Sequence, residues 1–155
     1  MSDHIKIIKK HSSDLVSRLG FEGEAIITEK DGVIYVNIQM DEPALLIGKG
    51  GEGLEALEHI LRLLVNAELK DDYRSIIVDI AGYRDKKVEY VKKMAHDIAF
   101  TVLSTGVAET LPPMSSYERR VVHMVCTNIA DVETESAGEG RDRRVVVKPK
   151  KVDKK

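Results

Sequence analysis

The sequence of 155 residues has no tryptophan, two phenylalanines and a single cysteine, Cys126. One cysteine excludes an intramolecular disulfide and any zinc site built from several cysteines. Its neighbours Met124 and Val125 are apolar, which predicts a buried small hydrophobic side chain rather than a nucleophile. With so few aromatic residues, the protein must build its cores from aliphatic side chains.

Long apolar runs are missing as well. No stretch approaches the roughly 18 residues that cross a membrane, and the N-terminus does not have the pattern of a signal peptide. We therefore expect a cytoplasmic protein. No two histidines stand at metal-ligand spacing with a third donor, and no Ser-His-Asp or paired-carboxylate pattern is present. The sequence thus predicts no metal, no cofactor and no catalytic residue.

Positive charge is scarce over most of the chain. The net charge is −2, yet residues 141–155 contribute +6, so the first 140 residues sum to −8. A basic end of this kind suits a polyanionic partner. We interpret residues 150–155 as a solubilising tail and give functional weight to Arg141, Arg143 and Arg144, which precede the strand-like "VVV".

Glycine is concentrated in "LLIGKGGEGLEAL" at 45–57. Gly48, Gly50 and Gly53 spell the G-x-G-x-x-G of dinucleotide-binding loops, whereas Gly48 and Gly51 spell G-x-x-G. A two-residue hairpin just before the loop, and the lack of further strand-helix-strand units after it, argue against a dinucleotide-binding sheet. A Walker loop is excluded because no Lys-Ser or Lys-Thr follows. A plain turn joining two helices is the structural alternative.

Periodicity predicts the elements of the first half. We expect a helix over 4–19, an antiparallel hairpin turning at Asp31-Gly32, a short segment ending at Ile47, and a strand in "RSIIVDI" closed by Gly82. Residues 66–73 are expected to form a polar loop. The helix after the glycines has an apolar face that comprises Leu54, Leu57, Ile60, Leu61, Leu64 and Val65.

The second half begins with a long amphipathic helix over 83–105. A short extended piece ends at two prolines, and Ser115 with Glu118 forms a capping box for a helix that runs to about Asn128. "DVETES" and "RRVVVKP" are strand-like. Arg119 and His123 share one face of the capped helix. This pair alone is a weak signal, since a surface arginine and a histidine satisfied at the helix edge give the same pattern.

The longer context resembles a known family. The order α-β-β-α-α-β around Ile47-Gly48-Lys49-Gly50-Gly51 resembles a type II KH domain, and "LPPMSSYERRVVHMV" with the following strands resembles the R-3-H (Arg-xxx-His) domain. Joined by "GYRDKK", the two resemble the Jag (SpoIIIJ-associated) family of bacterial KH–R-3-H proteins over residues 5–150. The implied fold class is α+β, with a KH domain at 1–82, an R-3-H domain of order α-β-α-β-β at 83–150 and a basic tail at 151–155.

Family members often carry an additional N-terminal Jag-N domain. The matching motifs of this sequence contain no such region, so no function of the Jag-N domain is transferred.

The resemblance also implies binding residues. The glycine loop of KH domains clamps about four nucleotides, which assigns Gly48, Lys49, Gly50 and Gly51 to nucleic-acid binding. Gly50 stands where relatives often have a polar or basic residue, and Glu52 follows. We therefore expect only weak electrostatic attraction between this loop and the phosphates of a nucleic acid. In the second domain, Arg119 and His123 would contact phosphate or base. Further candidates are Arg120, Lys148 and the pair Arg143 and Arg144, of which one should face the binding side.

The implied function is binding of single-stranded RNA by a post-transcriptional regulator linked to cell shape, elongation and division. The resemblance also implies a small single-KH partner protein, and a dimer is left open. Three alternatives remain at this point. They are a protein-interaction module with little RNA binding, a single-stranded DNA binder, and an enzyme acting at Arg119 and His123, against which the lack of a carboxylate cluster argues.

Overall fold

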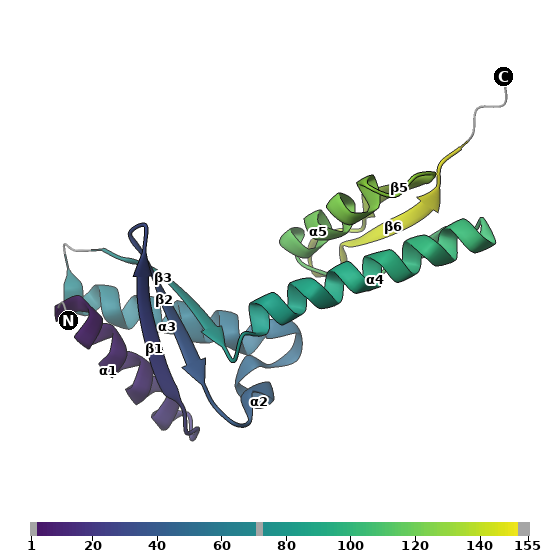
Figure 1. Ribbon diagram of the computed structural model, residues 1–155. Coiled ribbons are helices and arrows are strands. Elements are labelled where there is room, and N and C mark those ends of the chain that lie inside the picture. The colour runs from purple at the N-terminus through teal and green to yellow at the C-terminus, as the bar shows by residue number, and fades with distance from the viewer. Residues whose placement is uncertain (1–2, 71–72, 152–155) are drawn as a thin grey trace. The chain divides into compact units, whose positions relative to one another are not determined.

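The computed structural model describes residues 3–70 and 73–151. Contacts within the chain group into two compact units, Met1–Arg84 and Asp85–Lys155 (Figure 1). Helices and small sheets are mixed in both units, so the predicted α+β class is confirmed.

The first unit contains the six predicted elements in the predicted order. They are α1 (Asp3–Arg18), β1 (Glu24–Lys30), β2 (Val33–Gln39), α2 (Pro43–Ile47), α3 (Glu52–Leu69) and β3 (Ser75–Ile80), with a single 3₁₀ turn, η1 (Lys49–Gly51), between α2 and α3. The sheet order is β1-β2-β3, with β1 antiparallel and β3 parallel to the central β2. The parallel pair follows from the helical crossover between β2 and β3.

The hairpin turn lies where the sequence predicts it. Asp31 and Gly32 both have positive φ, 53° and 76°, and Lys30 pairs with Val33 across the turn. A two-residue turn with both residues in this region matches the natural twist of paired strands. The register therefore places Ile34, Val36 and Ile38 on one face of β2, where all three are buried.

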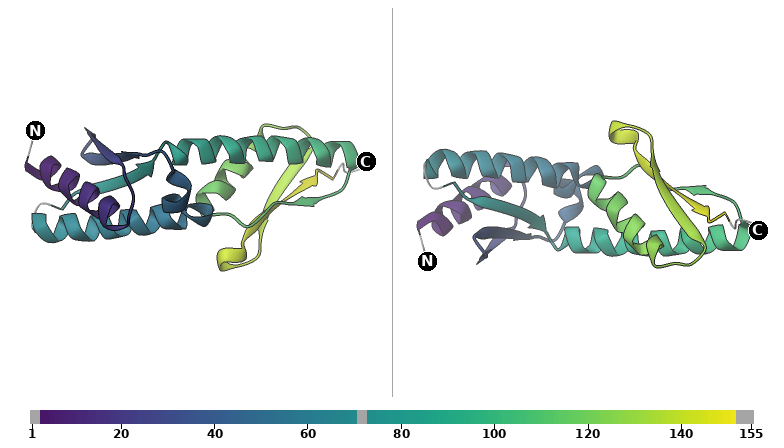
Figure 2. Two further views of the ribbon diagram at one scale, coloured as in Figure 1. Left: turned by 90° about the horizontal axis from the view of Figure 1, so that it is seen from below. Right: turned by 90° about the horizontal axis from the view of Figure 1, so that it is seen from above.

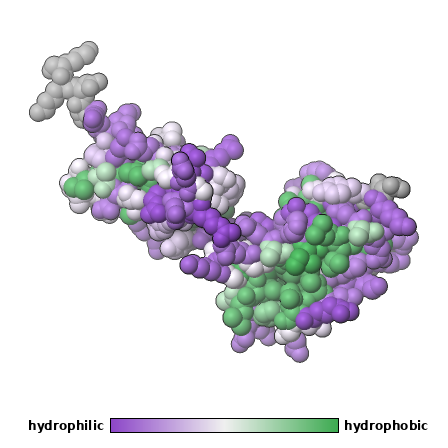
Figure 3. Space-filling view, turned by 180° about the vertical axis from the view of Figure 1, so that it is seen from behind, coloured by the Kyte–Doolittle hydropathy of each residue, from purple (hydrophilic) through white to green (hydrophobic). Residues whose placement is uncertain are grey.

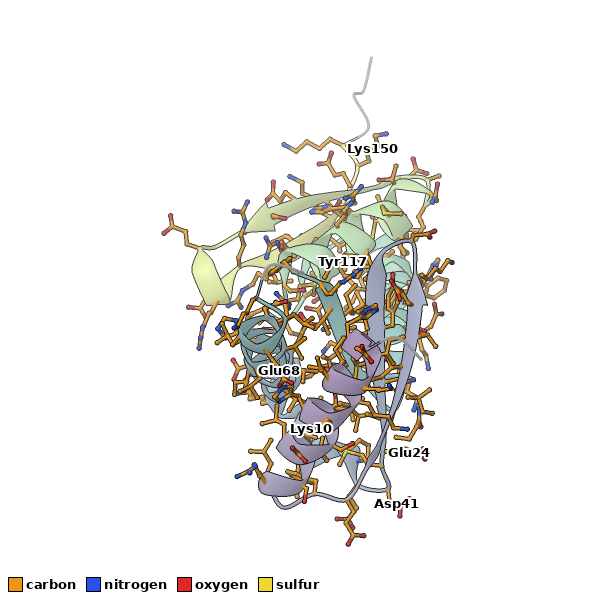
Figure 4. The ribbon with its side chains drawn as sticks, turned by 90° about the vertical axis from the view of Figure 1, so that its left-hand side faces the viewer. Lys10, Glu24, Asp41, Glu68, Tyr117 and Lys150 are labelled. Atoms are coloured by element: carbon orange, nitrogen blue, oxygen red, sulfur yellow. The ribbon has the colours of Figure 1, made fainter. Side chains whose placement is uncertain are left out.

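Helices α1 and α3 cover that buried face of the sheet (Figures 1 and 4). The two helices are joined by a hydrogen bond of 2.6 Å between Nε2 of His11 on α1 and Oε2 of Glu68 on α3, a residue that Figure 4 labels. Leu54, Leu57, Leu61 and Val65 of α3 enter the core, whereas Ile60 and Leu64 are 42 % and 40 % exposed. The predicted apolar face is therefore only partly buried, because the sheet does not cover the side of α3 that carries Ile60 and Leu64.

The predicted polar loop over 66–73 begins later than expected. Helix α3 continues to Leu69, and Lys70 ends it with a φ of 54°. No glycine or proline interrupts residues 66–69, so the helix has no reason to stop at Asn66. Residues 71–72 of the predicted loop lie outside the described residues.

The second unit also follows the predicted order. Its elements are α4 (Tyr83–Thr105, whose first two residues fall in the first unit), β4 (Glu109–Thr110), α5 (Ser116–Thr127), β5 (Val132–Ala137), the 3₁₀ turn η2 (Gly140–Asp142) and β6 (Arg144–Pro149). The sheet order is β4-β6-β5, and both pairings are antiparallel. Both hydrogen bonds of the capping box are present, with Oγ of Ser115 accepting from the Glu118 N–H, as predicted.

One face of this sheet packs against α4 and α5 (Figure 2). Small residues of α4 (Val91, Ala95, Ala99 and Val102) are buried with Val145 and Val147 of β6. Cys126 of α5 is 1 % exposed and lies in this core, and burial raises the pKa of its thiol. Cys126 is therefore the buried small hydrophobic residue that its neighbours predict.

Candidate nucleic-acid interface

The glycine loop of the first unit has a backbone that few other residues could adopt. Gly48 has φ 72° and ψ 177°, a combination that is essentially restricted to glycine. Gly50 and Gly51 also have positive φ, 62° and 89°. Lys49 and Gly50 are exposed at the tip of the loop, whereas Gly51 is buried at its base. The loop therefore presents bare backbone and one lysine to solvent.

The loop is held in place from below. The Gly48 N–H donates to the Ala44 carbonyl at 3.0 Å, and the Gly51 N–H donates to the Gly48 carbonyl at 3.3 Å. Tyr83 packs under Gly51 so closely that an added Cβ would lie 3.1 Å from its Cε1. Its neighbour Arg84 is fixed by Nε donating to the Val78 carbonyl and by Nη2 donating to Glu58 Oε2 at 2.7 Å. The motif "GYR" thus supports the loop within the first unit.

Helix α3 begins directly after the loop, with Gly51 as an N-cap that offers no side-chain acceptor. The first N–H groups of a helix and its positive dipole end are suited to phosphate. The Lys49 carbonyl accepts from the Glu52 N–H, whereas the Lys49 side chain forms no hydrogen bond or ion pair with the described residues, so its ammonium is available. Glu52 and Glu55 occupy the first turn, however, and their charge opposes an anion. A weak electrostatic attraction between this loop and a phosphate stays a prediction.

Helix α5 carries a second candidate site, which we call the basic hollow. Its volume is about 460 Å³, and its lining comprises Ser116, Arg119, Arg120, His123, Met124, Thr127 and Asn128 of α5 and Ser136 of β5. The hollow brings together three of the predicted binding residues, Arg119, Arg120 and His123. Two guanidinium groups that line one hollow can neutralise phosphate and bind it through planar pairs of N–H groups.

The two arginines differ in how firmly they are held. Nη1 of the half-buried Arg119 donates to the Met114 carbonyl at 2.9 Å, which fixes the side chain and leaves its other donors available. The Arg120 side chain is exposed and forms no hydrogen bond or ion pair with the described residues. Arg119 is therefore a preorganised donor, whereas no contact with the described residues fixes the guanidinium of Arg120.

His123 links α5 to β5 through both ring nitrogens. Nδ1 lies 2.6 Å from Thr134 Oγ1, and Nε2 lies 3.0 Å from Ser136 Oγ. Burial, and to a lesser extent the neighbouring charge of Arg119, lowers the pKa of His123, so the ring of the free protein is neutral near pH 7. A ligand can hydrogen-bond to this histidine only by replacing one of the two hydroxyl partners.

The other predicted residues do not line the basic hollow. Arg143 is exposed just before β6, and Nε of Arg144 donates to the Asp142 carbonyl at 2.9 Å. Nζ of Lys148 lies 2.9 Å from Glu135 Oε2, and this hydrogen bond raises the lysine's pKa. Glu133 is a second carboxylate partner of Lys148 at 3.6 Å. A role for these three residues stays a prediction.

Some residues of the basic hollow were not singled out from the sequence. Ser116, Thr127 and Asn128 stand one helical turn from Arg120, His123 and Met124, so polar residues at helical spacing could have indicated them. Ser136 reaches the hollow from β5, and no local pattern in the sequence indicates that approach.

Two negative findings limit the chemistry. Within residues 3–70 and 73–151, no group of three or more His, Cys, Asp or Glu side chains is placed to hold a metal ion. None of the helices in the same residues has the length and apolar character needed to cross a membrane.

The fold and the basic hollow define an α+β protein that carries an R-3-H domain, and comparison with known proteins agrees. The model of the R-3-H domain family matches residues 89–149. A protein of Clostridium symbiosum named RNA-binding protein KhpB is 36 % identical over 124 residues, which are 80 % of this chain and 54 % of that protein. The protein of the same name in Bacillus subtilis (strain 168) is 30 % identical over 151 residues, 96 % of this chain and 72 % of that protein.

A third relative, from Lactiplantibacillus plantarum, also bears the name RNA-binding protein KhpB and is 29 % identical over 133 residues. The chain therefore belongs to the KhpB family, which confirms its resemblance to the Jag proteins. The chain spans about half the length of the Clostridium relative and 41 % of the Lactiplantibacillus one.

Proposed function

We propose that this protein binds single-stranded RNA and acts as a post-transcriptional regulator. The observation that carries the proposal is the basic hollow, which is lined by both Arg119 and Arg120 and lies inside the segment that matches the R-3-H domain. The names of the relatives, all RNA-binding proteins, support the same ligand. A link to cell shape, elongation and division, and a cytoplasmic location, rest on the family resemblance alone.

We further propose that the first unit is a type II KH domain that contributes a second, weaker contact. Its support is the element order α-β-β-α-α-β, the parallel pairing of β2 with β3 and the exposed backbone of Lys49 and Gly50. Two weak contacts on one strand raise affinity through effective concentration. Both contacts bind and release the strand, and the proposal includes no bond-breaking step.

Titration of a labelled single-stranded oligoribonucleotide with the full chain tests the function. We expect binding whose log affinity falls with log salt at about 0.7 per phosphate neutralised. Arg119→Ala should weaken binding by about 1–3 kcal/mol and make the salt dependence shallower by about one phosphate. Arg18→Ala, which removes an exposed arginine at the end of α1, is the control for net charge. It should change neither the affinity for RNA nor its salt dependence. No binding at low salt would refute the proposal, and equal affinity for the DNA strand would favour the DNA alternative.

The glycine loop has a test of its own. Replacing Lys49-Gly50 by Asp-Asp adds negative charge at the exposed tip, and Asp is among the residues that tolerate the positive φ of Gly50. We therefore expect a folded protein with sharply reduced RNA affinity. Unchanged affinity in a folded variant would remove the loop from the binding mechanism.

A second function is favoured by the apolar face that α3 leaves uncovered. Its residues are exposed and recur at helical spacing (Ala56, Ile60, Leu63, Leu64 and Ala67), with Leu45 of α2 being 77 % exposed. Figure 3 shows a broad hydrophobic area on this unit. Continuous apolar patches of this kind mark protein contacts. We propose that this face binds another KH domain, either that of a small single-KH partner protein or that of a second copy.

Sedimentation of the wild-type chain and of Leu63→Glu across a dilution series tests self-association. A dimer that dissociates in the variant would identify the second copy as the occupant. A wild-type monomer would exclude it and leave a separate KH protein as the partner to be tested by titration.

A further inference from the structure

A groove runs between α4 and α5, next to the basic hollow on the adjacent face of α5. Its volume is about 400 Å³. The floor is apolar and comprises Val88, Val121 and Val125, and the walls comprise Lys92 of α4 and Tyr117, Arg120, Met124 and Asn128 of α5. The volume is within the range of roughly 300–1,000 Å³ that small-molecule sites occupy.

Tyr117 is an exposed aromatic residue at the wall of this groove. Its side chain is 63 % exposed and is not packed against the core of the second unit. Figure 4 labels Tyr117, which follows the N-cap of α5 by two residues. Folding of the unit therefore does not explain an aromatic ring here. An aromatic residue at this position could either pack in the core or stack on a base, and the exposure of Tyr117 excludes core packing.

A ridge on α5 separates the groove from the basic hollow. Arg120, Met124 and Asn128 are successive turns of the helix and line both depressions. One depression holds Arg119 and Arg120 and suits an anion, whereas the other has an apolar floor beside an aromatic ring. A nucleotide has the same two halves, an anionic phosphate and a flat base whose faces are apolar and whose edge is polar.

We propose that the α4–α5 groove binds a nucleobase of a single-stranded RNA, which stacks on Tyr117 while a neighbouring phosphate occupies the basic hollow. The inference rests on the proposed function and names the part of the RNA that this face recognises. Base stacking on an aromatic side chain is tolerant of sequence, because every base has a π-face. Nζ of Lys92 lies 2.8 Å from Glu89 Oε1, and the guanidinium of Arg120 has no partner among the described residues. Both cations line the groove, where a base can present its polar edge.

An apolar protein side chain is the other occupant that a groove of this kind could take. The two cations in its walls, and the ridge that it shares with the basic hollow, favour the base. A hydrophobic peptide would offer no counterpart to the Arg120 guanidinium and would have no reason to lie beside an anion site.

The test compares binding of a short single-stranded oligoribonucleotide by Tyr117→Ala, Tyr117→Phe and the wild-type full chain, at one salt concentration. We expect Tyr117→Ala to weaken binding about 5- to 150-fold, the range for loss of one stacked base, and Tyr117→Phe to retain most of the affinity. The matched control is Phe100→Ala, which removes a similarly exposed aromatic ring of α4 that does not line the groove. Because stacking involves no charge, the salt dependence of Tyr117→Ala should equal that of the wild type.

A second measurement needs no variant. An oligonucleotide with abasic positions keeps its phosphates, so it should bind the wild-type chain more weakly than the intact strand by a similar factor. The difference in affinity between the abasic and the intact strand should be smaller for Tyr117→Ala than for the wild type. If RNA binds the wild type but neither Tyr117→Ala nor the abasic strand weakens binding, the groove is not a base site and an apolar protein side chain becomes its occupant. If RNA does not bind the wild type at low salt, the proposed function itself fails.

Discussion

The substitution Gly53→Ala would test how closely α2 and α3 pack on either side of the glycine loop. Gly53 is the second residue of α3 and has the ordinary backbone of a helix, so the loop conformation itself does not require glycine there. Intrinsic helix propensity predicts that Gly53→Ala would stabilise the protein by about 1 kcal/mol. The structure predicts the opposite sign, because α3 starts in direct contact with the end of α2.

The magnitude follows from three distances. A Cβ on Gly53 would lie 2.3 Å from the Leu46 carbonyl oxygen, 2.9 Å from the Ile47 carbonyl oxygen and 3.0 Å from the Ile47 carbonyl carbon. All three atoms belong to the backbone of α2, so no side-chain rotation relieves the overlap, and α2 must shift. Overpacking of this kind costs about 3 kcal/mol. After subtraction of the propensity gain, we expect a net destabilisation of about 2 kcal/mol.

Amide hydrogen exchange over residues 43–69 is the suitable assay, because a chain of two units need not unfold in one step. A loss of about 2 kcal/mol corresponds to roughly 30-fold faster exchange of protected amides in α3. Ala56→Gly, at an exposed position one turn later, calibrates propensity and should lose about 1 kcal/mol. Slower exchange in Gly53→Ala than in the wild type would refute the close contact between α2 and α3.

Two further predictions concern the second unit. Ser115→Ala removes the acceptor for the Glu118 N–H and should destabilise α5 by about 1 kcal/mol, measured as faster amide exchange over residues 116–127, while an unchanged rate would show that the capping box contributes nothing. The pKa of His123 is lowered in the folded protein, so the unfolded chain takes up its proton first as pH falls. Stability should be full above about 6.5 and decrease below it. Urea unfolding at pH 7.5 and 5.5 should show that the free energy of unfolding falls less in His123→Asn than in the wild type. An equal fall in both proteins would contradict a lowered pKa of His123 as the cause.

Local signals in the sequence predict the elements well where one short pattern determines the conformation. Asp31-Gly32 predicts the hairpin because few other pairs adopt positive φ at both positions, and the register of β1 and β2 follows from that turn. Ser115 and Glu118 predict the start of α5 because each satisfies a backbone N–H of the other's segment. The resemblance to the family extends these local results to the order of all elements.

Periodicity does not show which apolar face is buried. Ile60 and Leu64 have the same helical spacing as Leu57 and Leu61, yet only the latter pair packs against the sheet. The difference depends on where α1 and the sheet lie around α3, which is a tertiary property. For the same reason the sequence could not show that Thr134 and Ser136 of β5 would form hydrogen bonds with the two ring nitrogens of His123.

The distribution of charge assigns different kinds of contact to the two units. Residues 1–84 carry ten Lys or Arg and fifteen Asp or Glu, a net charge of −5, whereas residues 85–155 carry fourteen and eleven, a net charge of +3. A phosphate near the glycine loop would meet Lys49 together with Glu52 and Glu55, so the attraction that remains comes mainly from backbone N–H groups, which do not depend on net charge. Counterion release, which makes nucleic-acid binding sensitive to salt, must then arise chiefly from the second unit. The salt dependence of RNA binding should therefore respond to Arg119 and Arg120 and barely to Lys49→Ala, even where the loop contributes affinity.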